Sequence, residues 1–218
     1  MGGRAVLRMS ENWKIRPALP ADAAATAPLI ALSMAGFGEA VLGLNDRPRL
    51  LRALEHFFRL PGSRFSHDCS FMAEMDGQVV GVLVAFPYAE MNARNLRMAG
   101  QFPGAYALSE MVKIVWLSLP MLRLPEVQRG EFYTANLAVD PTWQGHGVGA
   151  ALLNHAERLA ADNGLAVCSL NVDLDNPRAK ALYQRQGYQT TRTIATPALK
   201  ASHHSRGYEH MVKHLNIR

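Results

Sequence analysis

Three glycines stand close together in the run Gln144-Gly145-His146-Gly147-Val148-Gly149-Ala150, between an apolar, β-rich segment and a helical one. Glycine lets the backbone approach a ligand without a Cβ in the way, and it adopts positive φ readily. The first turn of the following helix has free N–H groups, with the positive end of the helix dipole behind them. Such a site suits a pyrophosphate. The structural alternative is a tight turn that needs positive φ and binds nothing.

A second ligand class fits part of this run. Gly145, Gly147 and Ala150 also match the dinucleotide-binding pattern, with Asp173 about 20 residues further on at a predicted strand end. However, residues 140–144 separate the preceding strand from Gly145, where that pattern requires an immediate turn. The loop also comes so late in the chain that too few strand–helix units follow it to complete a dinucleotide domain. A nucleotide-dependent oxidoreductase is therefore the minor alternative.

The segments around the glycine loop alternate between strand and helix. Tyr133–Val139 predicts a strand before the loop, and Gly147–Asn163 predicts a helix with its apolar residues on one face. Val167–Val172 follows as a buried strand. Asn176 then begins a second helix as its N-cap, with proline at the first helical position, and Gly187 ends it.

The N-terminal part of the chain predicts a strand, a helix capped by Asp22 and a second helix, at Trp13–Arg16, Asp22–Met34 and Pro48 to about Leu60. Two apolar, β-rich runs come next, Ser70–Met75 and Gln78–Phe86. Asp76-Gly77 lies between them and is a strong signal for a two-residue hairpin. We therefore expect these two strands to pair antiparallel.

Residues 87–130 mix helical patterns with several prolines, and we expect a mostly helical insertion there. Core packing explains its methionines and aromatic residues; the alternatives are an apolar wall over an acceptor site or a dimer surface. Two strands joined by a polar loop, Tyr188–Ile194 and Tyr208–Leu215, finish the sequence. No Pro/Gly/Ser-rich linker divides the 218 residues, so we expect a single domain, 1–218.

The composition, 49% hydrophobic and 19% charged, favours a soluble globular protein. The net charge is +5, but the excess lies in residues 1–16 and 197–218, so we expect no nucleic-acid groove. The most apolar run, Met111–Leu122, is too short to cross a bilayer, so no membrane association is expected. Only Cys69 and Cys168 are present, which favours reduced thiols in the cytoplasm. No metal site is expected.

Two motifs occur in order in the second half of the sequence. Gln144 to Gly149 has the form Q/R-x-x-G-x-G/A and follows a strand ending Leu137-Ala138-Val139-Asp140-Pro141. The second motif is Asn176-x-x-Ala179-x-x-Leu182-Tyr183-x-x-x-Gly187-Tyr188. Together they resemble the GCN5-related N-acetyltransferase (GNAT) family. The close resemblance covers residues 133–188, and the region 87–130 departs from the family's minimal fold.

The resemblance implies a fold and a cosubstrate. The fold is α/β of the α+β kind: one acyl-CoA N-acyltransferase domain with a mixed, mostly antiparallel sheet flanked by helices. The implied reaction is direct transfer of an acetyl group from acetyl-CoA to a primary amine through a tetrahedral intermediate, with no nucleophilic Cys or Ser. In such folds the strands matching Tyr133–Val139 and Val167–Val172 splay apart, and the pantetheine arm lies in the gap.

The resemblance also implies roles for individual residues. The backbone N–H near Leu137 would stabilise the oxyanion that forms when the amine attacks. Tyr183 matches the family's acid, which helps the thiolate to leave. The expected cofactor-binding residues are Leu137, Val139, Gln144, Gly145, His146, Gly147, Val148, Gly149, Ala150, Asn176 and Tyr183.

Several alternatives stay open. Tyr183 also fits a core aromatic with a satisfied hydroxyl. Glu131 is a possible base; Tyr133, Glu90 and Glu110 are further candidates by position, and a chain of waters would serve equally. The acceptor amine, a small molecule or a peptide, is not specified, and a homodimer is compatible with the sequence. A non-catalytic acyl-CoA-binding or sensing protein on the same fold is the main functional alternative.

Overall fold

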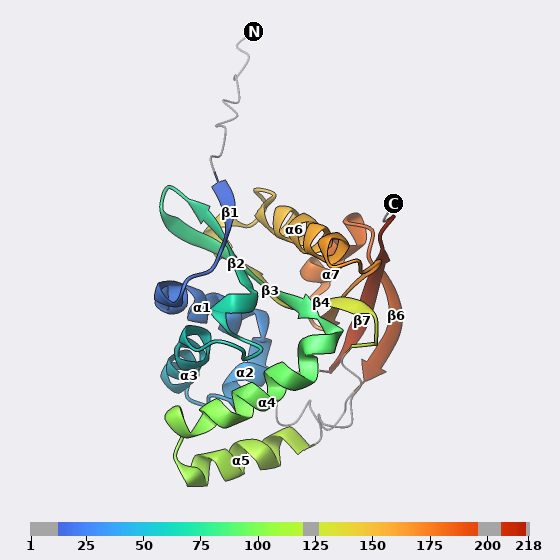
Figure 1. The fold of residues 1–218 in the computed structure, drawn as a ribbon. Helices are drawn as coiled ribbons and strands as arrows, with labels where there is room; N and C mark the ends of the chain where they lie inside the picture. Colours follow the sequence, from blue (N-terminus) through green and yellow to red (C-terminus); the bar gives the residue numbers. More distant parts are fainter. Residues whose placement is uncertain (1–12, 120–126, 196–205, 217–218) are drawn as a thin grey trace.

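The computed structural model describes residues 13–119, 127–195 and 206–216. Its strands form one sheet in the order β1-β2-β3-β4-β5-β7-β6 (Figure 1). Neighbouring strands are antiparallel except β4 and β5, which are parallel, so the predicted mixed, mostly antiparallel sheet is confirmed. The strands are β1 Trp13–Pro17, β2 Ser70–Met75, β3 Gln78–Pro87, β4 Glu131–Val139, β5 Val167–Asp173, β6 Gln189–Ala195 and β7 Gly207–His214.

Helices flank this sheet, and short 3₁₀ turns connect several of them. The α-helices in the described ranges are α1 Ala23–Ser33, α2 Ala35–Val41, α3 Arg47–Arg59, α4 Met91–Gln101, α5 Leu108–Ser118, α6 Val148–Asp162 and α7 Pro177–Arg185. The 3₁₀ turns are η1 Pro20–Asp22, η2 His67–Cys69, η3 Tyr88–Glu90, η4 Phe102–Gly104 and η6 Pro141–Trp143. None of the helices in these ranges is long and apolar enough to cross a membrane.

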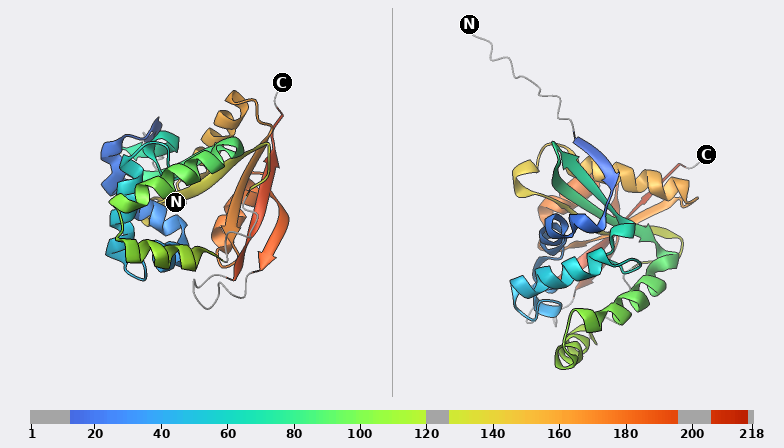
Figure 2. Two further views of the ribbon diagram at one scale, coloured as in Figure 1. Left: turned by 60° about the horizontal axis from the view of Figure 1, so that its bottom comes forward. Right: turned by 60° about the vertical axis from the view of Figure 1, so that its left-hand side comes forward.

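The inner strand β3 separates two apolar clusters. Side chains alternate between the faces of a strand, and accordingly Val82, Val84 and Phe86 belong to the cluster beneath α1 and α3. Leu83 and Ala85 belong to the cluster beneath α6 and α7. Figure 2 shows α1 to α5 gathered on one side of the sheet, with α6 and α7 on the other. Helices therefore cover both faces of the sheet near the end of β4, where the glycine loop begins.

The predicted turn glycines have the expected conformations. Asp76 and Gly77 have φ of 48° and 81°, and they close the antiparallel hairpin of β2 and β3. Gly164 and Gly187 follow α6 and α7 with φ of 68° and 90°, the left-handed region that favours glycine at a helix end. These local predictions are confirmed.

Two local features differ from the prediction. Helix α2 was not expected, because Gly36 and Gly38 both have low helix propensity. Asp22 does stand at the N-cap position of α1, but its carboxylate makes no hydrogen bond to that helix. It accepts instead from the Leu19 backbone N–H at 2.7 Å and from two guanidinium nitrogens of Arg16, each at 2.8 Å. Its carboxylate therefore ties η1 to strand β1.

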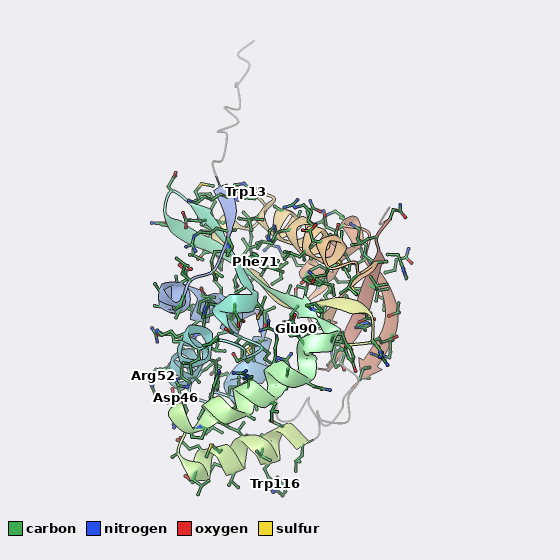
Figure 3. The ribbon with its side chains drawn as sticks, in the orientation of Figure 1. Trp13, Asp46, Arg52, Phe71, Glu90 and Trp116 are labelled. Carbon is green, nitrogen blue, oxygen red and sulfur yellow. The ribbon has the colours of Figure 1, made fainter. Side chains whose placement is uncertain are left out.

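Helices α4 and α5 lie in the segment expected as an insertion, and they pack onto the body of the fold. Met91, Met98 and Tyr106 are buried in the cluster that contains α3. The Phe102 ring lies 5.3 Å from the Phe57 ring of α3, measured between centroids. The outer side of α5 is exposed, and Trp116 points away from the sheet with 74% of its surface accessible (Figure 3). Residues 120–126 of the insertion and the polar loop 196–205 lie outside the described ranges.

Strands β4 and β5 pair over only part of their length. Their parallel register runs from Glu131 opposite Val167 to Thr134 opposite Leu170 and then stops, although β4 continues to Val139. The register between β3 and β4 also shifts, so that Ala135 of β4 has no partner in β3. This bulge increases the local twist of β4. The sheet consequently opens between the second halves of β4 and β5.

Candidate active site

A cleft of about 670 Å³ lies where β4 and β5 diverge. Five segments line it: the end of α1, the second half of β4, the glycine loop, the end of β5 and helix α7. The residues that line it are Leu32, Ser33, Leu137, Ala138, Val139, Trp143, Gln144, Gly145, Gly147, Gly149, Ala150, Asn171, Val172, Asp173, Asp175, Asn176, Arg178, Ala179, Leu182, Tyr183, Arg185 and Gln186. Nine of the eleven expected cofactor-binding residues are among them; His146 and Val148 are not.

The glycine loop connects β4 to the N-terminus of α6. Gly145 and Gly147 have φ of 89° and 86°, and a Cβ built on either would meet no atom within 4 Å. Both conditions suit a loop whose backbone approaches a ligand. Gly149 is small for another reason, because a Cβ there would lie 3.1 Å from the Leu182 side chain of α7. The third glycine therefore lets α6 and α7 pack closely.

Other side chains of the loop have structural roles. The Gln144 amide donates to the Val139 carbonyl at 3.1 Å and so holds the loop against β4. Val148 is buried in the core beneath α6. His146 is exposed, with its ring 5.8 Å from the Trp143 ring. The Val148 side chain is therefore turned away from the cleft, and only its backbone is left to contact a ligand.

The opposite wall of the cleft carries Tyr183 and Asn176. Tyr183 is 7% exposed, and its burial raises the pKa of the hydroxyl to about 12, so the hydroxyl keeps its proton at neutral pH. The Asn176 side chain accepts a hydrogen bond from the Ala179 N–H at 3.0 Å, which confirms its predicted N-cap role. Arg178 and Arg185 bring positive charge to the same wall, and no ion pair within the described ranges involves either of them.

Glu131 does not reach this cleft. It lies at the start of β4, six residues or about 20 Å of extended strand from Leu137, and it lines a separate cavity near Tyr88. Burial would raise its pKa, but hydrogen bonds from His210 and from the Gln128 N–H hold the pKa below its usual value. Direct proton transfer from an amine at Leu137 to Glu131 is therefore not supported by the geometry.

The other candidates for a base also lie elsewhere. Glu90 pairs with Arg94 at 2.6 Å, and Glu110 pairs with Arg49. No residue of the insertion lines the cleft within the described ranges, so the idea of an apolar wall over the acceptor site finds no support there. Cys69 and Cys168 are buried away from the cleft, and burial raises the pKa of each thiol to about 12. No group of three or more residues suited to hold a metal occurs in the described ranges.

Sequence reasoning missed two parts of the cleft. Leu32 and Ser33 reach it from the end of α1, and Asn171 reaches it from β5. The Asn136 amide of β4 donates to Ser33 Oγ at 2.9 Å and so joins α1 to the diverging strand. These residues come from separate parts of the chain, and only the order of the strands in the sheet brings them together.

The splayed strands, the glycine loop and the cleft together define an N-acyltransferase fold. The chain belongs to the Acetyltransferase (GNAT) family, whose model matches residues 44–188. The family and fold predicted from the two motifs are thus confirmed.

Solved structures and one curated protein resemble the chain. A crystal structure of an acetyltransferase is 25% identical with a TM-score of 0.69, covering 93% of this chain and 100% of that one. An N-acetyltransferase from Staphylococcus aureus Mu50 is 21% identical with a TM-score of 0.69, covering 92% and 100%, and shows the fold alone. A mycothiol acetyltransferase from Beutenbergia cavernae is 39% identical over 67 residues, which are 31% of this chain and 22% of that protein. The chain therefore matches only about a fifth of that relative's length.

Proposed function

We propose that this protein transfers an acetyl group from acetyl-CoA to a primary amine. The observation that carries the proposal is the cleft itself, in which a positive-φ glycine loop at the start of α6 leads into the gap between β4 and β5. Acetyl-CoA would supply the thioester that is cleaved. The open space at Gly145 and Gly147 and the unpaired N–H groups of the first turn of α6 fit its pyrophosphate.

The residues of the chain then have separate tasks. Arg178 and Arg185 add positive charge to the wall of the cleft, where the phosphates of CoA would lie. Beyond Thr134 the β5-facing edge of β4 has no strand partner, so the backbone at Leu137 and Val139 is open to the pantetheine arm. The Leu137 N–H would stabilise the oxyanion as the amine attacks the carbonyl carbon. The N–C bond forms, the C–S bond breaks, and the proton lost by nitrogen balances the proton gained by sulfur.

Tyr183 would act on the leaving sulfur. If the thiol of CoA resembles that of free cysteine, its pKa is about 8.5. Because burial raises the pKa of Tyr183, its hydroxyl stays protonated in the pH range where the thiolate forms, and it donates a hydrogen bond to that sulfur. With both cysteines outside the cleft, direct attack by the amine is the route that the described residues support.

The acceptor is an amine of a small molecule or a peptide, and the test must therefore use a panel. Acetyl-CoA is incubated with spermidine, lysine, glucosamine, kanamycin or a peptide with a free N-terminus, and release of the CoA thiol is followed. The proposal expects turnover with at least one amine. Binding of CoA without turnover of any amine would favour the acyl-CoA sensor instead. A thermal shift with NAD but none with CoA would favour the oxidoreductase. The mostly antiparallel sheet disfavours that alternative, because a dinucleotide domain has a mostly parallel sheet.

A further inference from the structure

The bulge in β4 turns two successive side chains to the same face of the sheet. Ala135 packs against the apolar cluster beneath α1 and α3, and Asn136 reaches Ser33 at the end of α1. The next side chain, Leu137, packs against the cluster beneath α6 and α7. Figure 2 shows these two groups of helices on opposite sides of the sheet. The bulge thus places the Asn136 side chain on the α1 side of the opening between β4 and β5, and the Leu137 side chain on the α6 side.

Two hydrogen bonds fix the orientation of the Asn136 carboxamide. Ser33 Oγ donates its single hydrogen to the Ile30 carbonyl at 2.7 Å. The same Oγ lies 2.9 Å from Asn136 Nδ2, and it can only accept there because its own hydrogen is already used. The nitrogen of the carboxamide therefore faces Ser33, and the oxygen faces away from it.

The carboxamide oxygen of Asn136 has no hydrogen-bond partner within residues 13–119, 127–195 and 206–216. The residue is nevertheless almost completely buried, with only 8% of its surface exposed. A buried acceptor without a partner costs about 1–3 kcal/mol, so such an atom usually has water or a ligand beside it. A carboxamide oxygen has two acceptor sites, and both are available on Asn136.

This acceptor lies next to the place where acetyl transfer would occur. Ser33, the hydrogen-bond partner of Asn136, and Leu137, its neighbour in the sequence, both line the cleft. The glycine loop at the start of α6 would hold the cofactor on the α6 side, which leaves the α1 side to the amine. An amine must present its lone pair to the carbonyl carbon, so a side chain can hold it there only by accepting from its N–H.

We propose that Asn136 binds the attacking amine by accepting a hydrogen bond from its N–H, and that Ser33 is a positioning residue that holds this carboxamide. The inference rests on the proposed function. A primary amine carries two hydrogens, so one can bond to Asn136 Oδ1 while the lone pair attacks. As the N–C bond forms, the nitrogen gains positive charge, and the hydrogen bond to the fixed oxygen strengthens. Asn136 takes no proton itself, because a carboxamide does not titrate at neutral pH.

The direct test is Asn136→Ala, with Asn163→Ala as the matched control. Asn163 also donates its amide to an oxygen of a helix, the Leu159 carbonyl at 2.8 Å, but it does not line the cleft. The probe is the amine of the panel that the wild-type protein acetylates fastest. We expect kcat/KM for this amine to fall about tenfold or more in Asn136→Ala and to stay within about twofold in the control. A wild-type kcat/KM in Asn136→Ala would overturn the inference.

Cofactor affinity separates the loss of the amine contact from damage to the cleft. In Asn136→Ala, the CoA affinity measured by calorimetry and the KM for acetyl-CoA should both stay within about twofold of wild type. A raised KM for acetyl-CoA with unchanged CoA affinity would overturn the inference, because Asn136 would then contact the acetyl group. If Asn136→Ala loses CoA affinity, Asn136→Leu, of similar volume, replaces it with the same expectations. Loss of CoA affinity in both variants would make Asn136 a structural residue and overturn the inference.

A double-mutant cycle tests the positioning role of Ser33. Ser33→Ala should lower kcat/KM for the amine in the wild-type background and have little further effect in the Asn136→Ala background, because it acts through that carboxamide. Ser33→Thr keeps the hydroxyl and should restore most of the activity. An equal factor in both backgrounds would overturn the positioning role. A wild-type protein that acetylates no amine of the panel overturns the proposed function and this inference together, whereas equal turnover by wild type and Asn136→Ala overturns only the inference.

Discussion

His210 Nε2 lies 3.2 Å from Glu131 Oε1. This contact joins β7, the neighbour of the edge strand β6, to the start of β4. The carboxylate is thereby directed toward the buried His210 ring, about 20 Å along the strand from Leu137. Glu131 is thus a partner of His210 in the structure and does not line the cleft. Leu137, Asn171 and Tyr183 do line it.

Gly147→Val is expected to abolish CoA binding. A side chain at this position would enter the open space beside the cleft, and valine disfavours the φ of 86° found there. Calorimetric titration with CoA should give an affinity weaker by about 100-fold or more.

Gly164→Val is the matched control for this substitution. Gly164 has φ of 68° at the other end of α6, and it also faces open space. The backbone strain should cost about 1–3 kcal/mol of stability in either variant. Only Gly147→Val should lose CoA affinity. Equal affinities in the two variants would show that the loop does not hold the cofactor.

Tyr183→Phe should lower kcat by about 100-fold while leaving CoA affinity nearly unchanged, because it removes only the hydroxyl that we propose donates to the leaving sulfur. Tyr188→Phe is the control. Tyr188 is also buried, its ring lies 6.3 Å from the Tyr183 ring, and it does not line the cleft. Steady-state kinetics with the best amine of the panel provide the measurement. A full rate in Tyr183→Phe would return Tyr183 to a purely structural role.

Local signals explain why the glycine loop and the strands and helices around it were predictable. Positive φ at Gly147 and Gly164, the cap by Asn176 and the hairpin at Asp76-Gly77 each depend on a few consecutive residues. In all four cases the residue type that favours a local conformation stands at the position that adopts it. The roles of the site residues remain predictions.

Features that depend on the order of strands were not predictable. Asn171 and His210 are 39 residues apart in the sequence and become neighbours only because β7 inserts between β5 and β6. The sequence around Asp22 is typical of a helix cap, but the Arg16 guanidinium on strand β1 donates hydrogen bonds to the Asp22 carboxylate instead. In both cases a contact made in the folded chain decides the role of a side chain.

Asp22→Asn should destabilise the protein at neutral pH and much less in acid. The Arg16 hydrogen bonds hold the pKa of Asp22 below its usual value, against the effect of burial. A lowered folded-state pKa contributes stability that is complete above the unfolded pKa of about 3.9 and is lost as the pH falls through the folded pKa. Urea unfolding should show a loss of about 1.5–3 kcal/mol at neutral pH.

The exposed Asp162→Asn of α6 is the control for this pH dependence and should change stability by less than about 0.5 kcal/mol. The difference between wild type and Asp22→Asn should shrink as the pH falls below the unfolded pKa of about 3.9 and the carboxylate becomes protonated. A difference that is the same in acid as at neutral pH would contradict the role given to the Arg16 pair.

The insertion and the body should unfold together, because Phe57 packs against Phe102 and Tyr106. Urea unfolding followed by circular dichroism and by tryptophan fluorescence should give coincident single transitions. Phe57→Ala should cost about 3–5 kcal/mol, whereas Leu96→Ala, at a position 76% exposed, should cost less than about 0.5 kcal/mol. A separate early transition for α4 and α5 would divide the chain into two domains.

Calorimetric titration of CoA into the wild-type protein tests the central claim most directly. The glycine loop and the splayed strands predict saturable binding of about one CoA per chain, with acetyl-CoA competing for the same site. A titration with no heat, together with no rise in melting temperature when CoA is added, would contradict the assignment of the cleft as an acyl-CoA site.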